Sequence, residues 1–174
     1  MAIYLNWDDG KIAGDATETG FTNWINIMQF NWGPQGGVDR TIRTETGRAQ
    51  NREHAQPHLK DIEITKEFDH STGLLLKELC SVPKAKTAKI AFVRTDPDGT
   101  IDAAYLVYTL TDAMLSGVNL NNQEAQGQHG ADRPVETWTI NFTEIAIDVK
   151  QLDQANVSGP AFHFKYNMAT GKEA

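Results

Sequence analysis

Cysteine is nearly absent from this chain, in which Cys80 is the only one among 174 residues. A single cysteine excludes an intrachain disulfide and predicts synthesis in a reducing compartment such as the cytoplasm. No N-terminal signal peptide is predicted, because Asp8 and Asp9 come before any apolar run of the needed length. No stretch approaches the roughly 18 apolar residues of a membrane helix, so we expect no membrane insertion.

Positive charge is also scarce. The net charge of −7 argues against a nucleic-acid-binding protein, since phosphate contacts need a concentrated basic surface. The hydrophobic fraction of 40% is ordinary for a globular chain, and there are no repeats or interdomain linkers. We therefore expect one domain over residues 1–174, which is long enough to bury a substantial core.

Signatures of catalysis and of metal binding are missing too. Asp96–Thr100 (DPDGT) resembles the start of a calcium loop but lacks the later ligands, so it is interpreted as a hairpin turn. His54 and His58 have the spacing of helical metal ligands, but Pro57 lies between them. His163 has no second histidine beside it, as a metal-binding barrel would require. The prediction is no catalytic residue, no metal, no cofactor and no enzymatic activity.

Alternation of apolar and polar residues, which is typical of β-strands, dominates what is present. One segment alternates Ile62, Ile64 and Phe68 against charged neighbours. In the segment 136–149 the apolar positions change from even to odd at Thr143–Glu144, which predicts a β-bulge and a bent strand. A similar change near Ala113 predicts a second bent strand. Long bent strands favour a barrel or a folded-over sandwich.

One short helix is predicted in the segment 69–80. Asp69, Ser71 or Thr72 can cap it, and four leucines follow at positions 74, 75, 76 and 79. We expect this helix to close a barrel end or to pack on one sheet. Cys80 ends the helix and is interpreted as a small buried hydrophobe rather than a reactive thiol.

The segment 24–33 has the alternation of a strand and is followed directly by a long polar loop. Its first face contains Trp24, Met28, Phe30 and Trp32, and we expect that face to lie in the core. Its second face contains the isoleucines 25 and 27 and then the two amides Gln29 and Asn31. The environment of this second face stays open at this point.

The loop over about residues 33–57 is rich in arginine. It contains Arg40, Arg43, Arg48 and Arg52, which give it a net charge of about +1 and leave about −8 on the rest of the chain. The simpler interpretation is a solvated loop. The alternative is a basic loop that reaches the acidic body of another copy, since arginine pairs well with carboxylates across interfaces.

Six segments in order resemble the Hcp family, the tail-tube proteins of bacterial type VI secretion. They are KIAGDA with Gly14–Asp15, FNWG, ITKEFDHSTGLLLKELC, AKIAFVRT, AAYLVYTLTDAMLSGVNL and ETWTINFTEIAIDVKQ. The resemblance implies a mainly β fold, a partly closed barrel of two sheets with one short flanking helix and long loops. It also implies hexameric rings that stack into a secreted tube and carry or chaperone small effectors in the lumen.

The partners implied by this resemblance are other copies of the chain, a VgrG-type spike, a contractile sheath and effector proteins. The tube would be assembled in the bacterial cytoplasm and then ejected without a signal peptide. The loop would contact the adjacent ring through its four arginines, and Gln29 and Asn31 would face the lumen. Two alternatives remain: a phage-type tail-tube protein, or a monomeric ligand- or metal-binding β-barrel.

Overall fold

The fold consists of ten β-strands and one α-helix, in a computed structural model that describes residues 1–33, 59–82, 84–94, 104–121, 134–152 and 158–173. The strands are β1 (Ala2–Trp7), β2 (Ile25–Ile27), β3 (Gln29–Asn31), β4 (Ile62–Glu67), β5 (Lys86–Val93), β6 (Leu106–Asn121), β7 (Val135–Asn141), β8 (Glu144–Leu152), β9 (Ser158–Asn167) and β10 (Lys172–Glu173). The helix is α1 (Ser71–Cys80), and a short 3₁₀ turn, Asp8–Gly10, follows β1. The loop 33–57 and the turn predicted at 96–100 lie outside the described residues, apart from Gly33.

Strand β6 is the longest strand, and it takes part in both layers of the structure. Its first half pairs with β5 and β8, and its second half pairs with β7. Between the halves Asp112 adopts a positive φ of 53°, a conformation that L-residues rarely adopt. The core-facing positions change there from Leu110 to Ala113, both fully buried. This confirms the bend that was predicted near Ala113.

Strands β7 and β8 pair with the second and first halves of β6, and the chain between them is interrupted beside the bend in β6. Trp138, Ile140 and Phe142 are buried on one side of the break, and Ile145 is buried on the other. The predicted change of phase is therefore confirmed, but two strands meet at a corner where one bulged strand was expected. The Thr143 N–H donates to the Thr111 carbonyl oxygen at 3.2 Å, and this hydrogen bond ties the corner to the bend in β6.

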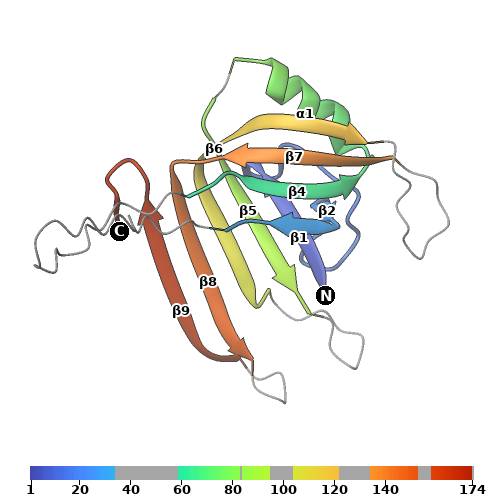
Figure 1. The fold of residues 1–174 in the computed structure, drawn as a ribbon. Helices are drawn as coiled ribbons and strands as arrows, with labels where there is room; N and C mark the ends of the chain where they lie inside the picture. The colour runs from blue at the N-terminus through green and yellow to red at the C-terminus, as the bar shows by residue number, and fades with distance from the viewer. Residues whose placement is uncertain (34–58, 83, 95–103, 122–133, 153–157, 174) are drawn as a thin grey trace, which may run out of the picture.

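These two bends fold the sheet over itself. One layer runs in the order β10-β9-β8-β6-β5-β1-β2, and the other connects β6 through β7 and β4 to β3. Because β2 and β3 follow each other in the chain, the two layers also join on the side opposite β6. The result is the partly closed, mainly β barrel of two sheets that the family resemblance implied, and β8 and β9 project from it (Figure 1).

The segment 24–32 is the main correction to the prediction of the core. It forms two strands, because Met28 separates β2, which pairs with β1, from β3, which pairs with β4. Ile25 and Ile27 are buried, whereas Met28 is 43% exposed. Phe30 and Trp32 pack against the core as expected. The inward-facing positions thus change from odd to even at Met28, and a single period-two pattern could not represent this change.

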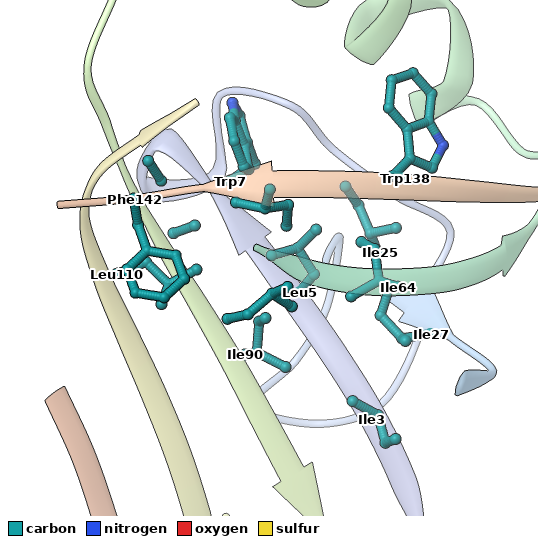
Figure 2. Close-up of a cluster of buried hydrophobic side chains, with 14 of the residues drawn as sticks. Ile3, Leu5, Trp7, Ile25, Ile27, Ile64, Ile90, Leu110, Trp138 and Phe142 are labelled. Atoms are coloured by element: carbon teal, nitrogen blue, oxygen red, sulfur yellow. The ribbon is translucent and has the colours of Figure 1, made fainter. Parts of the chain in front are cut away.

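The main core lies between the two layers. Figure 2 shows side chains from β1, β2, β4, β5, β6 and β7 meeting in this space, with Leu5, Ile64 and Ile90 near its middle. A second, smaller cluster lies on the other face of the β1–β5 sheet. There Tyr4 stacks on Phe21, and Trp24 contacts Phe21 edge to face. Trp24 therefore packs outside the barrel, contrary to the prediction.

Helix α1 begins where the cap was predicted and packs against the second half of β6 (Figure 1). The Asp69 carboxylate accepts hydrogen bonds from the backbone N–H of Ser71 at 2.8 Å and from its hydroxyl. Leu75 is buried, while Leu74 lies on the exposed side. Cys80 is also exposed, so its interpretation as a buried hydrophobe was wrong. It is the last residue of α1, whereas the buried residues Ser71, Thr72 and Leu75 lie in the first half of the helix.

Gly14 provides a test of the packing around β2. A Cβ atom at this position would lie 2.5 Å from the Cα of Ile25 and 2.5 Å from the carbonyl oxygen of Trp24. We expect Gly14→Ala to lower the free energy of unfolding by about 1–3 kcal/mol, since both backbones would have to move apart. Urea denaturation followed by tryptophan fluorescence would measure the change.

Gly73→Ala is the matched control. Apart from the neighbouring residues and the backbone of α1 itself, no atom lies within 4 Å of a Cβ built at Gly73, and alanine is the better helix former. We expect this variant to be unchanged or more stable by up to about 1 kcal/mol. Equal destabilisation of the two variants would contradict the close approach at Gly14.

Candidate functional site

The mouth of the barrel beside β3 is closed by aromatic side chains. Phe30 stacks near Tyr108 with a centroid distance of 5.1 Å and meets Phe92 edge to face at 5.2 Å. Trp32 meets Tyr108 at 5.8 Å, and its Nε1–H donates to the Lys60 carbonyl oxygen at 3.0 Å. Burial raises the pKa of Tyr108 above its ordinary value. These contacts hold β3 with its polar face outward.

Gln29 and Asn31 occupy that polar face. Both are exposed, and they flank Phe30, which packs inward. Each is uncharged and faces away from the core, as the alternation on β3 requires. The segment 29–31 therefore presents two amides to whatever lies outside the barrel.

A buried cluster of charged groups lies where α1 begins. The ammonium group of Lys66 is fully buried and donates to Glu136 Oε1 at 2.6 Å and to Asp69 Oδ1 at 2.8 Å. The hydroxyl of Thr72 also donates to Glu136 Oε1, at 2.8 Å. Lys66 and Glu136 lie directly opposite each other on β4 and β7. The cluster thus joins two strands to the first turn of the helix.

The alternation placed Phe68 on the same face as Ile62 and Ile64 and left Lys66 unremarked, whereas Lys66 is buried and Phe68 is 47% exposed. The sequence nevertheless contains a pattern from which this cluster could have been predicted. Lys66 follows Ile62 and Ile64 on the core-facing side of β4, and Glu136 precedes Trp138 on the core-facing side of β7. Opposite charges at core-facing positions of two strands are expected to pair, because an isolated buried charge is too costly.

A hollow of about 200 Å³ lies beside this cluster, between the junction of β2 and β3 and the end of β4. Its lining residues are Asp15, Asn26, Ile27, Met28, Glu67 and Asp69. Three of these side chains are carboxylates. Because Asp69 is paired with Lys66, the locally acidic character of the hollow comes from Asp15 and Glu67.

The strands that project from the barrel carry paired charges on one face. The Glu144 carboxylate accepts hydrogen bonds from Lys165 at 2.9 Å, Asn167 at 3.2 Å and Thr111 at 3.3 Å. The hydrogen bond from Lys165 is the main reason why the pKa of Glu144 lies below its ordinary value. The Nδ1 atom of His163 lies 2.6 Å from Asp148 Oδ1, across β8 and β9.

The part of the chain that the structure describes was compared with two kinds of site, a metal-binding group and a membrane-spanning helix. No three side chains among histidine, cysteine, aspartate and glutamate come together there as a metal-binding group. Among the same residues, no helix has the length and apolar character needed to span a membrane. His54, His58 and the loop arginines 40, 43, 48 and 52 lie outside the described residues.

Comparison with known proteins identifies the class. The fold is similar to that of a type six secretion system protein, with a TM-score of 0.82, 19% identity and 99% of both chains covered. It is also similar to Hcp1 from Salmonella typhimurium, with a TM-score of 0.68, 19% identity and 99% and 98% of the two chains covered. At these identities the likeness shows a shared fold.

Sequence comparison identifies the family. The family model described as "Type VI secretion system effector, Hcp" matches residues 4–149, so the chain belongs to the Hcp family. The chain is also 28% identical over 105 residues to Protein hcp1 of Pseudomonas aeruginosa. That match covers 59% of this chain and 60% of the relative's length.

The buried cluster generates a prediction about stability. Replacing Lys66 with methionine would leave the carboxylates of Glu136 and Asp69 buried without their cation. We expect Lys66→Met to lower the free energy of unfolding by about 3–5 kcal/mol. The double variant Lys66→Met/Glu136→Leu should recover much of this loss, because it removes a carboxylate together with the amine. Chemical denaturation at neutral pH would measure both.

The exposed pair of Asp148 and His163 is the control. Asp148→Asn should change stability by no more than about 0.5 kcal/mol, since both side chains are more than half exposed. A loss in Lys66→Met as small as that in the control would mean that the cluster does not hold the helix to the sheet.

Proposed function

We propose that this protein is a non-enzymatic tube subunit of a type VI secretion system, which forms hexameric rings that stack into a tube. The observation that carries the proposal is the family match over residues 4–149, together with a barrel that superposes on Hcp structures over nearly the whole chain. The absence of catalytic signatures from the sequence is compatible with a structural role. A ring requires contacts that close by rotation, and stacking requires a second, axial pair of surfaces.

The lumen of the ring is the place that we propose for Gln29 and Asn31. Both side chains are exposed on β3, beside the aromatic mouth of the barrel. Uncharged amides suit a passage that holds varied effector proteins without binding any one of them tightly. The small effectors would thus be carried or chaperoned in the lumen until release.

The axial contact is the role that we propose for the loop over about residues 33–57. Its arginines 40, 43, 48 and 52 would pair with carboxylates of the next ring, in keeping with the opposite charges of loop and body. The hollow beside the junction of β2 and β3 offers the carboxylates of Asp15 and Glu67 on the body. The tube would be assembled in the cytoplasm within a contractile sheath, topped by a VgrG-type spike, and then exported.

The mass of the protein in solution tests the proposal. We expect light scattering coupled to size exclusion to give about six times the chain mass of 19.3 kDa, and negative-stain images to show rings. The ring is held by contacts between copies, so the large species should dissociate on dilution. A strict monomer across concentrations would overturn the ring and favour the monomeric ligand-binding barrel.

The loop arginines generate a separate prediction. We expect Arg43→Glu/Arg48→Glu to leave single rings intact and to reduce tube formation, because like charges would face each other across the axial contact. Sedimentation and negative-stain imaging would measure the fraction of rings in tubes. Arg94→Glu, an exposed arginine outside the loop, is the matched control and should form tubes normally. Unchanged tubes in the double variant would exclude an axial role for these residues.

A further inference from the structure

One face of β8 and β9 is apolar, and none of the strands or the helix that the structure describes forms a layer over it. On this surface, here called the wing face, Ile147 lies opposite Phe164 and Val149 lies opposite Phe162. The neighbouring pair on the same face, Ile145 with Tyr166 at the start of β8, is buried in the core. Exposure then rises along the strands until Phe162 is 64% exposed. The wing face is therefore a continuation of the core beyond the part that the described residues cover.

The bends in β6 and between β7 and β8 explain why this face is left open. They turn β7 and β4 over the β1–β5–β6 part of the sheet, while β8 and β9 stay in the plane of the first half of β6. Figure 1 shows β8 and β9 extending away from the crossed layers. Nothing in the part of the chain that the structure describes forms a second layer over them.

The opposite face of the same two strands is polar. Its paired polar side chains include Lys165 with Glu144 and His163 with Asp148. Apolar residues on one face and polar pairs on the other are typical of an antiparallel sheet with one buried and one solvated face. By this pattern the wing face is the one expected to pack against another layer.

We propose that a second copy of this chain covers the wing face within the ring, with Phe162 as the anchor of the contact. This inference rests on the proposed ring. It assigns the lateral contact to a specific surface, in which a large aromatic side chain moves from water into a packed interface.

The strand order favours a copy of the chain as the occupant. β9 lies near one end of the order, and the junction of β2 and β3 lies at the other. That far junction exposes a second apolar side chain, Met28, and among the described residues β3 pairs with β4 alone. Two different surfaces at opposite ends of one sheet allow a head-to-tail contact, which is the type that closes into a ring.

Replacement of Phe162 tests the contact. We expect Phe162→Ser to fold normally, because most of the side chain is already exposed in the single chain. The concentration at which half of the chains are in rings should rise by about tenfold or more. Val82→Ser is the control, since Val82 is 80% exposed but lies after α1, away from the wing face. Light scattering would measure ring formation, and circular dichroism melting would confirm the fold of each variant.

The outcomes separate this inference from the proposed function. Rings in the wild type and in Phe162→Ser at the same concentration would overturn the assignment of the wing face and leave the ring intact. A wild-type protein that is always monomeric would overturn the ring itself. Loss of rings in Phe162→Ser but not in Val82→Ser is the expected result.

Thiol labelling gives a direct measurement of what covers the face. In a Cys80→Ser background, the thiol of Phe162→Cys should react with a maleimide about tenfold or more slowly in single rings than in dissociated chains, because burial limits access. Failure of this variant to form rings would equally support the contact. Labelling at the same rate in both states would overturn it. Protection that requires stacked tubes or added cargo would assign the face to an axial or effector contact instead, and would also overturn it.

Discussion

The bend shared by β6 and its neighbour is the constraint on which the rest of the structure depends. A sheet of this size with one apolar face must fold over itself or find another layer, since apolar surface left in water opposes folding. Asp112 takes the positive φ that turns β6, and its carboxylate accepts a hydrogen bond from the Thr143 hydroxyl at 2.9 Å. The corner between β7 and β8 is thus tied to the bend in β6, and the two strands turn together.

The bend has consequences at both ends of the barrel. It brings β7 and β4 over the core, and Glu136 and Lys66 come with them as the last pair of inward-facing residues. Their burial forces a pairing that also involves α1, so that the helix is attached through charge as well as through Leu75. At the opposite mouth, Phe30 and Tyr108 close the barrel and leave β3 with its amides outward.

The same bend leaves β8 and β9 outside the covered part of the sheet. A chain that needed only to fold would gain little from an apolar strip extending beyond its own core. A subunit of a ring needs such a strip, because the interface with its neighbour must bury apolar surface to be stable. Membership of the Hcp family, the acidic hollow on the body and the open wing face are all compatible with a protein that is completed by copies of itself.

The sequence by itself determined the class of fold, because alternation and its changes of phase depend on whether a side chain faces the core, and burial enforces this locally. The bends at Asp112 and at Thr143, and the helix after Asp69, were therefore predictable. Three features were decided by the tertiary structure: the exposure of Met28, the burial of Lys66, and the wing face left open by β8 and β9. Each depends on which layer passes over a given strand. That is set by contacts between residues distant in the chain, such as Lys66 with Glu136, and a local pattern carries no information about such contacts.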